Sequence, residues 1–211
     1  MTEKERAKKA VELLKGEYPT AICSLNYSDA FQLLIATRLS AQCTDARVNV
    51  VTPDLFKEYP TPEAMAKAPV ESIENLIKTC GLYKTKAKDL KEIAIRLVEV
   101  YGGKVPKEMS DLLTLSGVGR KTANLVRGDI FGEAAVVCDT HFIRLCNRMG
   151  FVNTKDPLKV EQKMLKILPT LESNDFCHRA VLHGRAVCTA RKAFCEKCVL
   201  SEVCKKKLEK N

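Results

Sequence analysis

The 211-residue sequence lacks a long uninterrupted apolar run. Gln32 and Arg38 break the apolar stretch FQLLIATRLSA, so we expect no membrane-spanning segment. The first residues, MTEKERAKKAVELLKGEYP, alternate charged with small apolar side chains and contain no apolar core of the secretory-signal type. Both absences argue against a membrane protein or a secreted one.

Sustained alternation of apolar and polar residues, the pattern of a half-buried β-strand, is also absent, as are internal repeats and low-complexity linkers. Apolar residues instead recur with helical spacing between turns rich in glycine and proline. The sequence therefore predicts an all-α fold. The expected helices span residues 3–17, 29–38, 44–57, 70–78, 84–101, 109–114, 120–131, 140–149, 157–167, 172–186 and 196–204.

Positive charge and cysteine are abundant. The 35 Lys and Arg residues outnumber the 26 Asp and Glu residues, for a net charge of +9. A basic surface binds polyanions, so nucleic acid is the first candidate partner and an anionic membrane the second. Without a secretory signal, the ten cysteines indicate a reducing compartment. Six of them are scattered and are expected to be small buried hydrophobes: Cys23, Cys43, Cys80, Cys138, Cys146 and Cys177.

The other four cysteines, Cys188, Cys195, Cys198 and Cys204, have the spacing C-x6-C-x2-C-x5-C. Four thiolates bind either tetrahedral zinc or a [4Fe–4S] cluster, and the ligand count alone does not separate the two. Many zinc sites contain two C-x2-C pairs, whereas this segment has one, which mildly disfavours zinc. Because residues 188–204 hold too few apolar side chains for a core, we expect a metal centre to organise them.

The segment LSGVGRKTANLV, residues 115–126, predicts a glycine turn that opens a helix. Gly117 and Gly119 flank Val118 and permit a positive φ and the close approach of another molecule. The N-terminus of the following helix exposes unpaired N–H groups and a positive dipole end, which together bind phosphate. Arg120 and Lys121 add positive charge there. An ordinary hinge between two packed helices is the alternative.

Lys121 and Asp139 are the candidate catalytic residues. An ammonium group is disfavoured at a helix N-terminus beside Arg120, which favours the free amine, and a free amine can form a Schiff base. A solvated or phosphate-binding lysine is the alternative. Asp139 precedes a predicted helix, where a carboxylate can cap the helix, stabilise a cation or accept a proton. His141, two residues later, is expected either to contact phosphate or to hydrogen-bond locally.

LSGVGRKTANLV, VCDTHFIRLCNR and the four-cysteine tail together resemble the endonuclease III family of helix–hairpin–helix DNA glycosylases. The similarity also includes LLIATRLSAQCTDARVN (33–49), CGLYKTKAKDL (80–90) and LHGRAVCTARKAFC (182–195). The resemblance implies that Lys121 is the Schiff-base nucleophile and Asp139 the essential carboxylate. It also implies that Gln42 and Leu82 insert into the duplex and fill the gap left by an extruded base. Taken alone, Gln42 would be assigned to a helix entry and Leu82 to the core.

The resemblance further implies a fold of two helical domains, residues 22–132 and residues 1–21 together with 133–211. The second would carry a [4Fe–4S] cluster held by the four C-terminal cysteines. Arg191 and Lys192, between the first two ligands, would form a rigid basic loop that contacts phosphates, as would the Gly117–Arg120 turn. Two positions depart from the family pattern. Ser116 replaces a common proline, which should loosen the turn, and Cys138 replaces an apolar residue.

The implied activity is that of a bifunctional DNA glycosylase and apurinic/apyrimidinic lyase of base-excision repair, acting on damaged, oxidised pyrimidines. Three alternatives remain: a monofunctional mismatch or uracil glycosylase, a non-catalytic helix–hairpin–helix DNA-binding protein, and a zinc-dependent nuclease. Lys121 argues against the monofunctional enzyme. We expect a cytoplasmic monomer, nucleoid-associated in a prokaryote, whose partner is double-stranded DNA containing damaged bases or abasic sites. The preferred lesion depends on dispersed pocket residues.

Overall fold

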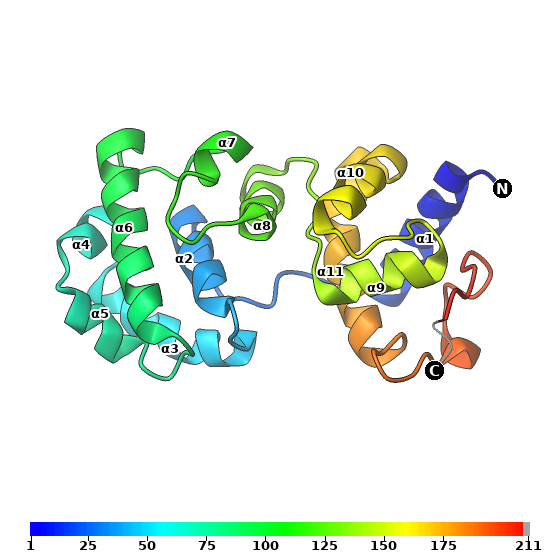
Figure 1. The fold of residues 1–211 in the computed structure, drawn as a ribbon, viewed down its shortest axis with the longest axis horizontal. Helices are drawn as coiled ribbons and strands as arrows, with labels where there is room; N and C mark the ends of the chain where they lie inside the picture. The colour runs from blue at the N-terminus through cyan, green and yellow to red at the C-terminus, as the bar shows by residue number, and fades with distance from the viewer. Residues whose placement is uncertain (209–211) are drawn as a thin grey trace. The chain divides into compact units, whose positions relative to one another are not determined.

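The computed structural model describes residues 1–208, which form α-helices and short 3₁₀ turns (Figure 1). Within this range there is no strand, and an isolated antiparallel bridge joins Cys188 to Ala193. The prediction of an all-α fold is therefore confirmed. None of the helices in the described part of the chain is both long and apolar enough to cross a membrane.

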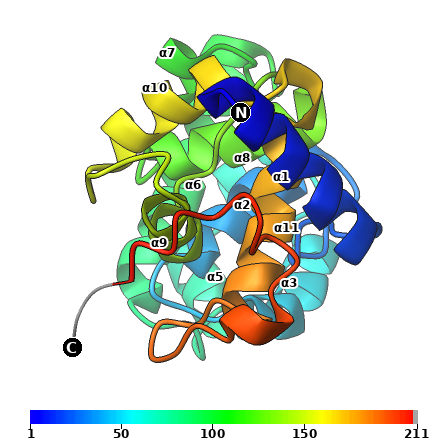
Figure 2. The ribbon, with the colours of Figure 1, turned by 90° about the vertical axis from the view of Figure 1, so that its right-hand side faces the viewer.

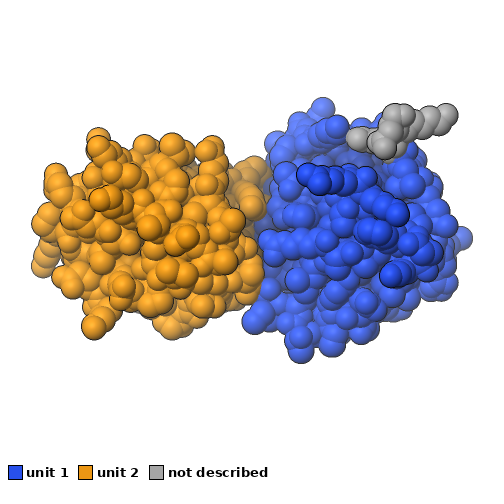
Figure 3. Space-filling view, turned by 90° about the horizontal axis from the view of Figure 1, so that it is seen from below, with its two compact units in different colours: residues 1–22, 132–211 blue, residues 23–131 orange. Residues whose placement is uncertain are grey.

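The chain divides into two compact units, drawn in different colours in Figure 3. One unit is Cys23–Phe131, and the other combines Met1–Ile22 with Gly132–Asn211. That each unit folds as an independent domain stays a prediction. The units are described separately below.

The unit Cys23–Phe131 is built around α2, whose residues 33–36 are completely buried. Polar N-caps start several of its helices: the side chains of Asp29, Thr44 and Thr61 each accept a backbone N–H bond from the first turn. The helices are α2 (Ala30–Ser40), α3 (Asp45–Glu58), α4 (Pro62–Lys67), α5 (Val70–Leu76), α6 (Tyr83–Tyr101), α7 (Met109–Leu112) and α8 (Arg120–Phe131).

Helix α4 falls where the sequence analysis expected only a turn. Thr61 caps α4 by accepting the Ala64 N–H at 3.3 Å, and Pro62 occupies the first helical turn. Proline is favourable at this position because its missing N–H would have no partner inside the helix. Tyr59 therefore ends α3, whereas Thr61 and Pro62 start α4, which packs against α6.

The second unit contains α1 (Glu3–Glu17), α9 (Thr140–Met149), α10 (Pro157–Ile167), η1 (Thr170–Glu172), α11 (Ser173–Ala186) and η2 (Cys195–Lys197). Helix α11 packs against α9 and α1, as Figure 2 shows. Phe142 and Phe176 meet edge to face, with ring centroids 6.0 Å apart. The predicted helix at 196–204 is wrong, because only the short η2 turn forms there and irregular turns follow it.

Arg6 of α1 is almost completely buried and links this helix to the C-terminal tail. Its guanidinium donates to the carbonyl oxygens of Met149 at 2.6 Å and Val203 at 2.9 Å. The same group lies 4.4 Å from the centre of the Phe151 ring, a cation–π contact. These bonds hold the tail that carries Cys204 against α1 and the end of α9.

Candidate active site and cysteine cluster

A largely buried ion pair supports the glycine turn between α7 and α8. Gly117 has a φ of +66°, and the Arg38 side chain from α2 occupies the space where a Cβ of residue 117 would lie. Arg38 pairs with Asp89 of α6, and the two side chains are 13% and 14% exposed. The Ser116 hydroxyl donates to the other carboxylate oxygen of Asp89 at 2.8 Å. A hydrogen bond thus ties the turn at the position where the family commonly has proline.

The start of α8 faces solvent. Gly119 has no positive φ, and a Cβ added to it would meet no atom within 4 Å. Arg120 and Lys121 follow it and are exposed. Val118 differs from its neighbours, since its side chain is buried and its N–H donates to the Leu115 carbonyl at 3.1 Å. Val118 therefore holds the turn while Gly119, Arg120 and Lys121 form its outer surface.

Gln42 and Leu82 both have a left-handed backbone, with φ values of 53° and 58°. Among non-glycine residues of the described chain, only Lys206 shares this conformation, which costs about 1–2 kcal/mol per residue. Leu82 is 59% exposed, so it is not the core residue that its position after Gly81 would otherwise suggest. A Cβ built on Gly81 would lie 3.3 Å from the Gln42 carbonyl oxygen. The Gln42 and Leu82 loops therefore abut.

Lys86 of α6 bonds to the last turn of α2, inside the protein and close in sequence to the same two loops. Its side chain is completely buried, and Nζ donates to the Leu39 carbonyl of α2 at 2.8 Å. Burial lowers the pKa of Lys86. Lys86 does not stand out in the sequence, because a lysine among charged neighbours normally faces solvent. Its helical spacing from Leu90 and Ile93, both buried, is the signal that would have identified it.

Asp139 caps α9 with its Oδ1 atom, which accepts the Phe142 N–H at 2.7 Å. This bond uses one carboxylate oxygen and orients the group at the start of the helix. His141 Nδ1 lies 3.1 Å from the Arg144 guanidinium, so His141 makes the local hydrogen bond that was one of its two expected roles. Lys121 belongs to the unit Cys23–Phe131 and Asp139 to the other unit.

The four C-terminal cysteines line one small, mostly apolar pocket. Nitrogen atoms lie 3.3 Å from three of the sulfur atoms: Arg148 Nη1 from Cys188, His183 Nε2 from Cys198 and the Lys206 backbone nitrogen from Cys204. Sulfur atoms in a common pocket with N–H donors are typical of iron–sulfur ligation. No three His, Cys, Asp or Glu side chains within residues 1–208 form a site for a single metal ion.

The cysteines in this pocket also raise the pKa of neighbouring thiols. Burial raises the pKa of Cys198 and of Cys204, and the neighbouring cysteines raise it further. A bound metal centre would reverse this effect, because coordination deprotonates a thiol outright. The donor set, its enclosure and its N–H partners therefore fit a thiolate-ligated cluster.

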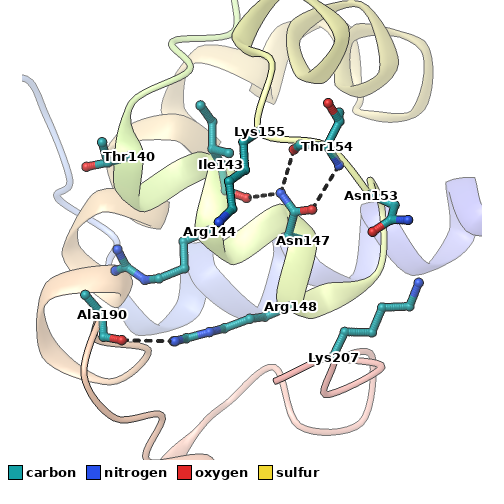
Figure 4. A pocket seen from close by; sticks show the side chains of 10 residues that line it. All are labelled: Thr140, Ile143, Arg144, Asn147, Arg148, Asn153, Thr154, Lys155, Ala190 and Lys207. Atoms are coloured by element: carbon teal, nitrogen blue, oxygen red, sulfur yellow. Dashed lines mark hydrogen bonds between the residues drawn. The ribbon is translucent and has the colours of Figure 1, made fainter. Parts of the chain in front are cut away.

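Arg148 fastens the basic loop that follows Cys188. Its guanidinium donates to the carbonyl oxygens of Thr189 at 2.7 Å and Ala190 at 3.3 Å, the second drawn in Figure 4. Arg191 and Lys192 are exposed in this loop. Arg148 also lines a pocket of ≈ 650 Å³. Among the described residues that line it, none is acidic and four are cationic: Arg144, Arg148, Lys155 and Lys207. This side of the second unit is suited to anions.

Comparison with known proteins finds relatives that match almost the whole chain. Residues 35–170 match the family described as HhH-GPD superfamily base excision DNA repair protein. Endonuclease III of Synechocystis sp. is 45% identical over 204 residues, covering 96% of this chain and 93% of the relative. Endonuclease III of Escherichia coli is 42% identical over 194 residues, covering 92% of each chain.

Two solved structures are similar over nearly the whole chain. A trapped covalent intermediate of endonuclease III with DNA has a TM-score of 0.89 at 39% identity, and the match covers 98% of this chain and 97% of that one. A thermostable thymine-DNA glycosylase has a TM-score of 0.86 at 27% identity, with 96% of each chain covered.

Proposed function

Because the chain belongs to the endonuclease III family of the HhH-GPD superfamily, we propose that it is a base-excision DNA glycosylase with apurinic/apyrimidinic lyase activity. Its substrate is duplex DNA that contains an oxidised pyrimidine or an abasic site. One observation carries the proposal: Lys121 is exposed in the first turn of α8, directly after the glycine turn, in a chain that matches endonuclease III almost end to end. A solvent-facing amine at a phosphate-binding helix start is available to attack a sugar carbon.

DNA binding uses the exposed surfaces of both units. The N–H groups at the start of α8, together with Arg120, bind a backbone phosphate, and Gly119 allows the strand to approach closely. The basic loop with Arg191 and Lys192 binds further phosphates. Gln42 and Leu82, held on left-handed backbone, fill the space left when the damaged base leaves the stack.

The proposed base excision and strand cleavage use Lys121 as the nucleophile and the carboxylate of Asp139. Nζ of Lys121, as the free amine, attacks C1′ of the sugar as the damaged base departs, and Asp139 supports the loss of the base. The C1′–O4′ bond of the sugar ring then breaks, and the Schiff base that forms at C1′ acidifies the C2′ hydrogen. Loss of that proton breaks the C3′–O bond and releases the 3′ phosphate, and water then hydrolyses the Schiff base and frees Lys121. The Asp139 oxygen outside the cap bond stabilises the cationic intermediates.

The four C-terminal cysteines are proposed to hold a [4Fe–4S] cluster. When bound, the cluster supplies structural cross-linking rather than a step of base excision, because it joins the end of α11 to the C-terminal tail. Arg148 holds the same region from the protein side, because its guanidinium donates hydrogen bonds to the Cys188 sulfur and to the loop between the first two ligands.

Borohydride trapping on a duplex with an abasic site tests the proposal. Borohydride reduces a Schiff base, so the parent protein should become covalently attached to DNA. Lys121→Ala should bind the duplex but give no adduct, whereas Arg120→Ala removes a neighbouring positive charge and should retain the adduct. Undiminished trapping by Lys121→Ala would eliminate Lys121 as the nucleophile.

A monofunctional mismatch glycosylase is the second candidate, favoured by the similarity to the thymine-DNA glycosylase structure. Such an enzyme would release thymine from a G·T mismatch and give no trapped adduct. The proposed enzyme should instead release an oxidised pyrimidine and nick the strand in the same reaction. Parallel assays on the two duplexes separate these outcomes.

A further inference from the structure

Cys43 and Cys80 have no role in the proposed mechanism, yet they lie beside the two inserting residues. Cys43 follows Gln42, and Cys80 comes two residues before Leu82. Each ends a turn at the close of a helix: the Cys43 N–H donates to Ser40 at 3.1 Å, and the Cys80 N–H donates to Ile77 at 2.8 Å. The two turns are in contact, since a Cβ on Gly81 would lie 3.3 Å from the Gln42 carbonyl. The Cys43 thiol is an electrostatic neighbour of Cys80 across this contact, since after burial Cys43 is the next cause that raises the pKa of Cys80.

The two thiols differ in accessibility. Cys43 is half-buried, whereas Cys80 is only 2% exposed. Arg47 and Lys86 place positive charge next to the pair. A partly exposed thiol in an electropositive setting is the kind that oxidants attack. Burial raises the pKa of Cys80 to about 11, so Cys80 is suited to react second, after its neighbour has been oxidised.

We propose that Cys43 and Cys80 are a redox modification site that forms a reversible disulfide with peroxide and thereby ties the Gln42 loop to the Leu82 loop. Hydrogen peroxide oxidises the Cys43 thiol to a sulfenic acid and releases one water. The Cys80 sulfur then attacks the Cys43 sulfur, the S–S bond forms, and the hydroxyl departs with the Cys80 proton as a second water. Two thiols lose two electrons and one peroxide gains them. A dithiol reductant reverses the bond.

The consequence for DNA rests on the proposed function. Gln42 and Leu82 must enter the duplex from two separate loops, and each is held on strained backbone. A disulfide between the loops prevents the two backbones from adjusting independently as the base leaves. Coupling of this kind typically changes affinity by 5-fold or more, so the oxidised protein should bind abasic-site DNA about 5-fold more weakly than the reduced protein.

Peptide mapping tests the disulfide without reference to DNA. The cluster-loaded protein is treated with hydrogen peroxide, its free thiols are alkylated, and tryptic peptides are identified by mass spectrometry. LSAQCTDAR (39–47) should be linked to TCGLYK (79–84), and dithiothreitol should separate them. Cys43→Ser should abolish the link. Cys23→Ser should retain it, because Cys23 lies outside both linked peptides. Oxidation of Cys43 without a link to Cys80 would overturn the proposal.

Fluorescence anisotropy on a duplex with a stable abasic-site analogue tests the effect on binding. The oxidised parent protein should bind more weakly and recover with dithiothreitol, while Cys43→Ser should be insensitive to peroxide. A fully cross-linked protein with unchanged affinity would overturn the proposed control of DNA binding. Failure of the reduced protein to bind this duplex would instead count against the proposed repair function, since peptide mapping reports the disulfide independently.

Discussion

Gly117 and Gly119 stand two residues apart in one turn but serve different purposes. Gly117 has a positive φ and packs against Arg38, whereas Gly119 has neither constraint. Gly117→Ala should therefore lower the free energy of unfolding by about 1–2 kcal/mol from backbone strain alone, and by more once Arg38 is displaced. Gly119→Ala should change it by less than about 0.5 kcal/mol. Urea unfolding measures both.

The affinity for duplex DNA should also distinguish Gly117→Ala from Gly119→Ala. The methyl group of Gly119→Ala would lie on the surface proposed to meet the DNA strand, so affinity should fall although stability is retained. Equal losses of stability in the two variants would contradict the assignment of different roles to these glycines.

Ser116 illustrates how one side chain can replace the rigidity of a proline. Its hydroxyl bond to Asp89 should contribute about 1 kcal/mol, so Ser116→Ala should lower stability by that amount and weaken binding to duplex DNA. Ser116→Pro restricts the backbone directly and should keep the parent affinity. Unfolding and binding curves for the three proteins provide the test. A Ser116→Ala variant with parent stability would show that the bond to Asp89 has no net effect.

At the scale of elements, the basic loop depends on α9. Arg148 donates to the carbonyl oxygens of Thr189, in a part-buried bond, and of Ala190, and a hydrogen bond from a charged group contributes about 1.5–3 kcal/mol. Arg148→Met should therefore loosen the loop around Cys188 and speed the loss of iron to a chelator. Arg191→Met removes an exposed arginine of the same loop and should leave the rate of iron release unchanged. Iron release followed by absorbance compares the two, and identical rates would exclude Arg148 as the anchor.

Two elements show where sequence patterns succeed and fail. Helix α10 (Pro157–Ile167) was predicted with its observed bounds because Asp156 caps it and its apolar spacing is regular. Helix α4 was missed, since two prolines close together suggest a turn although one of them is also a favourable helix start. The expected helix at 196–204 failed because its apolar spacing comes from residues that enclose the cysteine pocket.

For the whole molecule, the net charge of +9 makes DNA affinity sensitive to salt. Each phosphate contact contributes about 0.9 to the slope of log affinity against log salt concentration. Replacing Arg191 and Lys192 together with alanine should therefore reduce the magnitude of the slope by about 2. Replacing Lys4 and Lys8 of α1 removes the same charge outside the proposed contacts and should leave the slope unchanged. Equal slopes for the two double variants would refute a specific role for the loop.

Local patterns in the sequence determined the helical class, the glycine turn and the cysteine set, and they indicated the endonuclease III family that the comparisons confirm. Helical spacing, caps and motifs all act within a few residues, so they can be recognised without a fold. Only the tertiary structure decided which distant residues meet, because packing of α2 against α6 brings together positions about fifty residues apart. The support of the turn by Arg38 and Asp89, the buried Lys86 and the contact between the Gln42 and Gly81 turns all depend on that packing.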